Sequence, residues 1–77
     1  MEIEFIEFLA KSLVSNPDKV QVSQRQGENG MVVQLSVDAG DVGRVIGKQG
    51  RIARAMRTLL NAVNTHDGMR YSLEIVD

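Results

Sequence analysis

The spacing of apolar residues changes along this chain between a helical and a strand-like period. The order of these changes limits the fold more than any other feature. Apolar residues first recur every three to four positions, as on the buried face of an amphipathic helix. In other segments they alternate strictly with polar residues, which is typical of strands with one covered face. The predicted elements, in the order α-β-β-α-α-β, are helix 3–14, strands 20–23 and 31–37, helices 40–46 and 51–64, and strand 71–75.

Short breaks separate these predicted elements. Asn16-Pro17-Asp18 ends the first helix, because proline restricts the preceding residue to extended geometry. The segment 26–30 is rich in residues that tolerate positive φ, so it predicts a hairpin between the first two strands. Residues 47–50 interrupt the helical pattern between the second and third helices, and residues 65–68 read as a loop.

The pattern predicts an α+β fold, a two-layer sandwich with all three helices on one face of a three-stranded mixed sheet. The last strand is expected to lie parallel to strand 31–37, because the intervening pair of helices is long enough for a crossover. Residues 1–77 are expected to form a single domain. The predicted buried face of the last helix consists of Ile52, Ala55, Met56, Leu59, Leu60 and Val63, with Arg54, Arg57 and Asn61 opposite.

Size and composition favour a binding module over an enzyme. A chain of 77 residues has little room for an enclosed active-site cavity, and no catalytic constellation stands out. Asp38 and Asp41 are expected to cap the second helix, not to act as a catalytic pair. The absence of cysteine excludes disulfides and thiolate metal sites, and His66 has no second metal ligand at a usable spacing. We therefore expect no catalytic residue, no metal and no cofactor.

The amino terminus favours neither a signal peptide nor a membrane anchor. It is acidic where a signal peptide is basic, and no apolar run approaches the roughly 20 residues that span a bilayer. The sequence thus predicts a cytoplasmic protein without a membrane partner.

Charge is distributed unevenly along the chain. The formal net charge is −1, yet the stretch from Arg44 to Arg57 contains no acid. The acids Glu2, Glu4 and Glu7 lie instead in or near the first helix. Because the local field attracts a ligand, this predicts an anionic partner for a basic patch. The basic residues of the stretch are Arg44, Lys48, Arg51, Arg54 and Arg57.

The break at Gly47-Lys48-Gln49-Gly50 suits the binding of phosphate. Glycines at both ends let the backbone turn sharply and let a ligand approach closely. Gly50 immediately precedes a helix whose first amide groups have no partner within the helix. Lys48 and Arg51 add positive charge, and Arg44 extends a basic rim. On spacing alone, the loop could equally serve only to join two helices.

Nucleotide-binding loops do not fit this glycine spacing. A P-loop needs four residues between its first glycine and its Gly-Lys pair, but only three separate Gly43 from Gly47. Gln49 also stands where a magnesium-binding hydroxyl is required, and no Gly-x-Gly-x-x-Gly occurs.

The segment Val45-Ile46-Gly47-Lys48-Gln49-Gly50-Arg51-Ile52 resembles the signature of KH domains. The order α-β-β-α-α-β is similar to their prokaryotic, type II topology. The resemblance continues through Asn16-Pro17-Asp18, the run 41–50 and the segment 57–61. Over essentially the whole chain, the sequence resembles small bacterial single-KH-domain proteins of the KhpA type.

The resemblance implies a groove that holds about four unpaired nucleotides of RNA, with residues 47–50 clamping their backbone. It also implies a dimer, or pairing with a larger KH-containing protein, and a role as an RNA chaperone or post-transcriptional regulator. Aromatic residues are few and none lies near the loop, so we expect weak base preference. The expected RNA-binding residues are Gly47, Lys48, Gln49, Gly50, Arg51, Arg44, Arg54 and the groove-lining or supporting Val45, Ile46 and Ile52.

A second hypothesis gives the protein–protein contact more weight than the RNA contact. Phe8 points away from the apolar stripe of the first helix, among charged residues, and marks a candidate partner surface. Under this hypothesis the chain is a protein-interaction module of the same fold, and RNA contacts are secondary.

Overall fold

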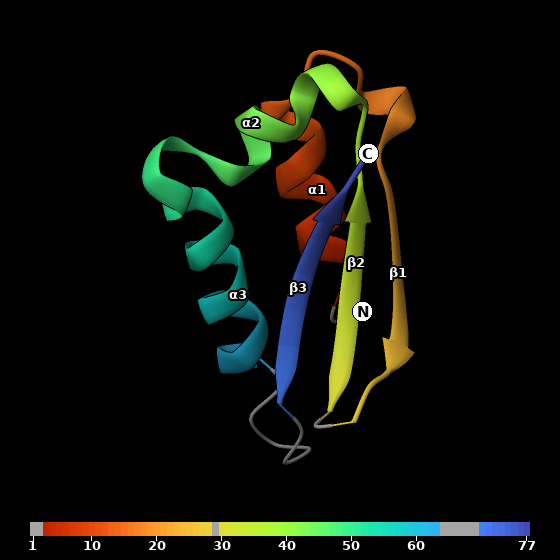
Figure 1. The fold of residues 1–77 in the computed structure, drawn as a ribbon, viewed down its shortest axis with the longest axis vertical. Coiled ribbons are helices and arrows are strands. Elements are labelled where there is room, and N and C mark those ends of the chain that lie inside the picture. Colours follow the sequence, from red (N-terminus) through yellow and green to blue (C-terminus); the bar gives the residue numbers. More distant parts are fainter. Residues whose placement is uncertain (1–2, 29, 64–69) are drawn as a thin grey trace.

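The helices and strands follow one another in the predicted order, α-β-β-α-α-β, with short 3₁₀ turns between some of them (Figure 1). The structure is a computed structural model that describes residues 3–28, 30–63 and 70–77. The elements are α1 (Glu4–Leu13), η1 (Pro17–Lys19), β1 (Gln21–Gln26), β2 (Met31–Ser36), η2 (Ala39–Asp41), α2 (Val42–Ile46), η3 (Lys48–Gly50), α3 (Arg51–Val63) and β3 (Tyr71–Val76).

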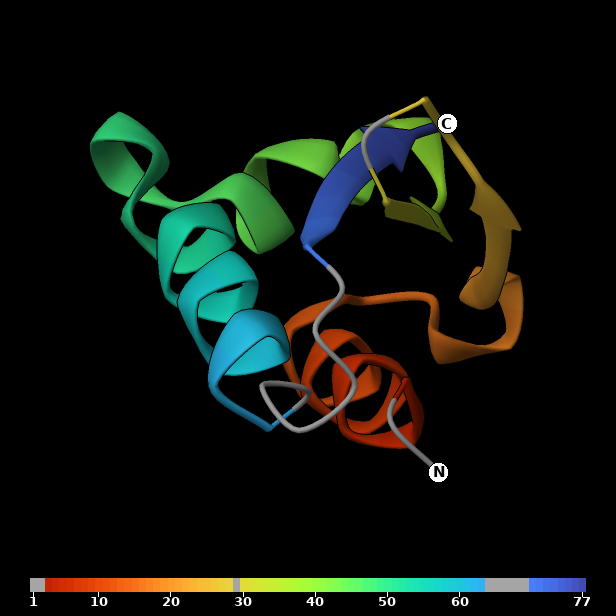
Figure 2. The same cartoon turned by 90° about the horizontal axis from the view of Figure 1, so that it is seen from below.

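The three strands form one mixed sheet in the order β1-β2-β3. β1 runs antiparallel to β2, with Val22 opposite Leu35, and β2 runs parallel to β3, with Val33 opposite Leu73. The three α-helices lie on one face of this sheet, so the predicted two-layer α+β sandwich is confirmed (Figures 1 and 2). On the uncovered face, Arg25 of β1 reaches across β2 to Glu74 of β3, with an N–O distance of 3.3 Å.

The hydrophobic core lies between the sheet and the helices. The α1 stripe contributes Ile6 and Ala10, both completely buried, and β2 contributes Val33 and Leu35. Strand alternation accounts for this pattern, because every second β2 side chain points toward the helices. The described core residues are Ile6, Ala10, Val20, Val33, Leu35, Val37, Val45, Met56, Leu60 and Tyr71.

The first strand was predicted too short. β1 continues to Gln26 although most of its side chains are polar and exposed. Its backbone pairs with β2 through the register Gln26↔Met31, and backbone hydrogen bonds form whatever the side chains are. The alternation rule detects only strands with a covered face, and this part of β1 has none.

The predicted buried face of α3 was too wide. Met56 and Leu60 are buried, but Ala55 is exposed and Leu59 keeps 44% of its surface accessible. Because α3 lies at the margin of the helical layer, only one side of it meets the core (Figure 2). Asn61, expected on the solvent side, instead bonds to the backbone of β3. The side chain of Val63 and the predicted loop 65–68 lie outside the described residues.

The first helix ends earlier than predicted. Its last residue is Leu13, and Val14 is already extended. Pro17 then opens the turn η1, where its missing N–H has no cost because the first amides of a helix are unpaired anyway.

Candidate nucleic-acid interface

The connection between α2 and α3 is a sharp turn in left-handed backbone. α2 ends at Ile46, and Gly47, with φ of 79°, donates its N–H to the Gly43 carbonyl at 2.9 Å. Gly50 has φ of 74° and donates to the Gly47 carbonyl at 3.1 Å. Gln49 between them has φ of 58°, a conformation that costs free energy in any residue with a Cβ.

The two glycines of this turn have different surroundings. A Cβ on Gly47 would lie 2.6 Å from Cγ1 of Ile52, because the Ile52 side chain packs directly over the Gly47 backbone. A Cβ on Gly50 would meet nothing within 4 Å. Gly47 is therefore required for packing inside the protein, whereas the space beside Gly50 is open to a ligand.

Two backbone amides of the turn are available as donors. Gly47, Gly50 and Arg51 donate their N–H groups to carbonyls of the preceding residues. Within the described part of the chain, the N–H groups of Lys48 and Gln49 make no hydrogen bond. Successive free amides of this kind in a turn of mixed handedness form a concave site for anions.

The turn and the start of α3 carry cations that have no acidic partner in the described part of the chain. Lys48, Arg51 and Arg54 are exposed, and none of them has an ion pair with an acid among residues 3–28, 30–63 and 70–77. The ion pairs in that part of the chain involve Lys11, Arg25 and Arg44. The positive charge beside the turn is thus left for a ligand.

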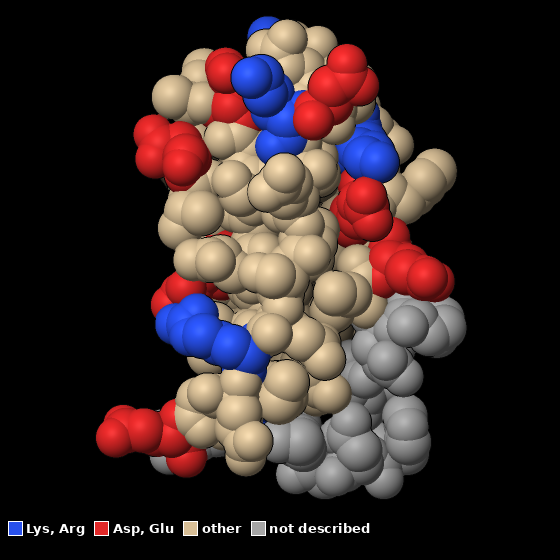
Figure 3. Space-filling model, turned by 90° about the vertical axis from the view of Figure 1, so that its right-hand side faces the viewer, with Lys and Arg blue, Asp and Glu red and all other residues tan. Residues whose placement is uncertain are grey.

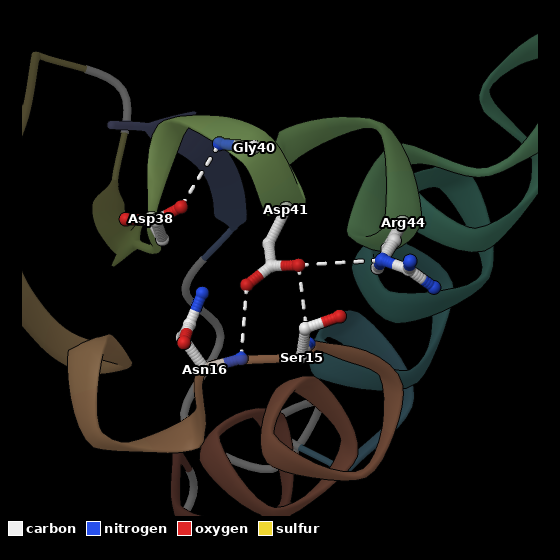
Figure 4. A network of polar contacts seen from close by, with 6 residues as sticks. All are labelled: Ser15, Asn16, Asp38, Gly40, Asp41 and Arg44. Atoms are coloured by element: carbon white, nitrogen blue, oxygen red, sulfur yellow. Dashed lines mark hydrogen bonds and ion pairs between the residues drawn. The ribbon is translucent and has the colours of Figure 1, made fainter.

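Arg44 differs from the other predicted cations because Asp41 holds it. Its Nε lies 3.3 Å from Oδ1 of Asp41, and its terminal nitrogens point away from that carboxylate (Figure 4). Asp41 is only 2% exposed and also accepts hydrogen bonds from the amides of Ser15 and Asn16, each at 3.1 Å. The predicted capping by Asp41 is therefore wrong, whereas Asp38 accepts from Gly40 N–H as a cap does.

The apolar residues of the segment 45–52 differ in their burial. Val45 is completely buried and belongs to the core. Ile46 and Ile52 are half-buried on either side of the turn, and Ile52 packs against the core. Ile46 and Ile52 are thus the apolar members of the signature that keep part of their surface accessible.

A second feature, an apolar groove between α1 and α3, was not anticipated. It encloses about 390 Å³ and is lined by Leu9, Ser12, Leu13, Arg51, Ile52, Ala55, Met56 and Leu59. Phe8, as predicted, is exposed, with 69% of its surface accessible. The sequence signal for the groove was present in Leu59 and Ala55, but helical periodicity assigned both to the core.

The other surfaces are less distinctive. Seen from the β1 side, acidic and basic side chains are interspersed around an uncharged centre and form no basic patch (Figure 3). No group of three or more His, Cys, Asp or Glu side chains that could hold a metal occurs among the described residues. In the same part of the chain, no helix is long and apolar enough to cross a membrane.

Comparison with known proteins identifies the family. The model of the KhpA/KhpB KH-domain family matches residues 3–75. RNA-binding protein KhpA of Aquifex aeolicus is 50% identical over 74 residues, which cover 96% of this chain and 94% of that protein. KhpA of Treponema pallidum is 51% identical over 77 residues, which cover all of this chain and 96% of the relative.

Solved structures of lower identity share the fold. An Era variant from Aquifex aeolicus bound to GDP and AlF₄⁻ superposes with a TM-score of 0.59 at 19% identity. Era in complex with MgGDPNP and nucleotides 1506–1542 of 16S ribosomal RNA gives the same score at 20% identity. Each match covers 97% of this chain but only 29% of the Era chain.

These comparisons confirm the KH fold. The names of the relatives describe a binding protein, in agreement with the expectation that the chain is not an enzyme. With a family match over residues 3–75 and relatives at about half identity over nearly full length, the chain belongs to the KhpA/KhpB family of KH-domain proteins.

Proposed function

We propose that this chain binds single-stranded RNA through the Gly47-Lys48-Gln49-Gly50 turn and the helices that flank it. It acts in the cytoplasm as a non-enzymatic RNA chaperone or post-transcriptional regulator. The observation that carries the proposal is the pair of amides of Lys48 and Gln49, which have no acceptor among the described residues, beside cations that have no acidic partner there. The names of the KhpA relatives support RNA as the ligand.

Phosphate oxygens are the groups that the turn is suited to hold. The two free amides donate to them, and Gly50 leaves space for the sugar–phosphate backbone to come close. Lys48, Arg51 and Arg54 neutralise phosphate charge. Asp41 holds Arg44 through Nε, so the two terminal nitrogens of Arg44, which point away from that carboxylate, can donate to a phosphate as well (Figure 4). Because guanidinium groups are planar donors, they suit phosphate geometry.

Bases are contacted by apolar side chains and by the open edge of β3, which faces α2 and α3 (Figure 1). The carbonyls of Arg70 and Val76 bond to β2, so the alternate residues Leu73 and Ile75 turn their backbone groups to the free edge. Those groups have no partner in the described structure. With Ile46 and Ile52, this edge offers each base van der Waals contacts and backbone hydrogen bonds, which give weak sequence preference.

Pairing of two protein chains uses the groove between α1 and α3, together with Phe8. The partner is a second copy of the chain or a larger protein that contains a KH domain. The charges of the two helices support this surface, because α1 carries exposed acids such as Glu4 whereas α3 carries Arg51, Arg54 and Arg57. A partner of the same fold therefore brings an acidic helix to a basic one. Linking two weak RNA sites raises avidity by roughly 10²–10⁴ when both engage one RNA.

One pair of variants separates RNA binding from pairing. Lys48→Asp/Gln49→Asp should abolish binding of a short unstructured RNA and leave sedimentation of the protein unchanged. Phe8→Asp should weaken self-association and leave the intrinsic affinity of each site for a short RNA unchanged. Affinity of the wild type should fall with salt, with a log–log slope of about −2 if Lys48, Arg51 and Arg54 each neutralise one phosphate.

The opposite result favours the other hypothesis. If the loop variant is folded and binds RNA like the wild type, RNA is not held at this turn and the chain is a protein-interaction module. If wild-type protein sediments as a monomer at high concentration, the partner is the larger KH-containing protein.

A further inference from the structure

A second hollow lies at the far end of α3, where the helix approaches the start of β3. It encloses about 520 Å³ between the two elements. Its lining does not include the turn at residues 47–50, and the RNA contacts proposed above do not use it. Its lining consists of Arg57, Thr58, Asn61, Arg70, Tyr71 and Ser72.

One wall of this hollow is fixed by hydrogen bonds. The Asn61 side-chain amide donates to the Tyr71 carbonyl and its oxygen accepts from Tyr71 N–H, both at 2.9 Å. The same amide donates to the Arg57 carbonyl at 3.0 Å, and Thr58 Oγ1 donates to the Arg54 carbonyl at 3.0 Å. Asn61 and Thr58 thus use these donors within the protein, and the wall is held in place without a ligand.

The free donors of the hollow are two guanidinium groups. Arg57 comes from α3 and Arg70 from the residue before β3, and both are exposed. Neither guanidinium group has an ion pair or hydrogen bond within the described residues. Two like charges at one hollow repel each other, and a bound anion converts that repulsion into attraction. Planar guanidinium groups favour an anion with two or more oxygens, such as a phosphodiester.

A row of arginines along α3 connects the turn to the hollow. Arg51, Arg54 and Arg57 follow at intervals of three residues, so they form one row along the helix. The row advances about 9 Å from Arg51 to Arg57. Arg51, Arg54 and Thr58 line an adjoining depression, and Thr58 also lines the hollow with Arg57 and Arg70. A strand held at residues 47–50 therefore has a basic path to Arg70.

We propose that Arg57 and Arg70 bind a phosphodiester of the same RNA strand, beyond the four nucleotides held at the turn. This site rests on the proposed RNA-binding function and extends its footprint. It predicts that the chain distinguishes RNAs by length, because a tetranucleotide held at residues 47–50 does not reach the second site.

The test compares unstructured oligouridylates of four and eight nucleotides. Wild-type protein should bind the octamer with a log–log salt slope steeper by about 0.7, because one additional phosphate is neutralised. The slope is the decisive readout, since extra binding registers on a longer RNA raise affinity without adding phosphate contacts. Arg57→Gln/Arg70→Gln should bind the tetramer like the wild type and lose the additional slope on the octamer. Lys19→Gln/Arg25→Gln removes the same charge elsewhere and should keep that slope.

Three results would overturn the second site. The first is an equal salt slope for the tetramer and the octamer in the wild type. The second is an arginine variant that loses the same affinity for both RNAs. The third is a Lys19/Arg25 control that loses the additional slope on the octamer as the arginine variant does. A changed association state of the arginine variant, with unchanged RNA slopes, would assign the hollow to protein contact instead. The variant Lys48→Asp/Gln49→Asp tests the proposed function on which the second site rests. If this variant binds both RNAs like the wild type, the turn at residues 47–50 is not the RNA-binding site.

Discussion

At the scale of single residues, the turn between α2 and α3 concentrates unusual backbone. Gly47, Gln49 and Gly50 all have positive φ, and Gln49 does so with a Cβ. Strained backbone of this kind persists where surrounding structure holds it, and it is common at binding sites. Here the constraint comes from Ile52, which packs over Gly47, and from the hydrogen bonds of Gly47 and Gly50 to preceding carbonyls.

The two glycines should therefore respond differently to alanine. Gly50→Ala should lower the free energy of unfolding by about 1 kcal/mol, the cost of left-handed backbone in a residue with a Cβ. Gly47→Ala should cost about 1–3 kcal/mol more, because its Cβ meets Ile52 at 2.6 Å. Urea denaturation of both variants measures the difference. Equal losses would show that Ile52 moves aside without cost.

At the scale of elements, Asp41 joins two parts of the helical layer. It lies at the start of α2, and its carboxylate accepts from the amides of Ser15 and Asn16 just after α1 (Figure 4). The same carboxylate holds Arg44. One buried side chain thus fixes α2, and with it the turn, against the end of α1.

Asp41→Asn should consequently destabilise the protein by about 1–3 kcal/mol. An asparagine can accept only through its oxygen, so one partly buried hydrogen bond, from the N–H of Ser15 or Asn16, loses its acceptor. The matched control is Asp38→Asn, which should change stability by less than about 0.5 kcal/mol because asparagine caps as well as aspartate. Chemical denaturation of both variants gives the comparison. A loss no greater for Asp41 than for Asp38 would contradict the joining role.

At the scale of the whole molecule, one cluster of buried side chains connects the sheet to all three helices. It includes Ile6 of α1, Val45 of α2, Leu60 of α3 and Tyr71 of β3. A protein of 77 residues with this single described core has an expected stability of about 4–12 kcal/mol. The elements should therefore lose their structure together.

Tyr71 allows a direct measurement of that cooperativity. It is the single tyrosine of a chain without tryptophan, and only 7% of its surface is exposed. Its fluorescence in urea should follow the same transition as the far-UV circular dichroism, because the core and the helices unfold in one step. Two separate midpoints would instead indicate that α3 and β3 unfold independently of the rest.

The sequence by itself determined the element order, the single-sided sheet and the position of the turn at residues 47–50. These features follow from local rules: side-chain periodicity fixes which face of an element is apolar, and glycine spacing marks where backbone can turn. The family signature followed from the same segment. The features that these rules missed depend on contacts between elements. The polar half of β1 is a strand through its pairing with β2, although its own side chains gave no signal.

Only the tertiary structure decided which predicted surfaces are occupied and which are free. Periodicity cannot show that α3 lies at the margin of its layer, so it assigned Leu59 and Ala55 to the core. It cannot show that Arg44 is held by Asp41 while Arg51 and Arg54 have no acidic partner in the described structure. Nor does it bring Arg70 beside Arg57, thirteen positions earlier, because their proximity depends on how β3 returns along α3. The physical reason is common to all three: exposure and ion pairing are properties of neighbours in space, which a local pattern does not contain.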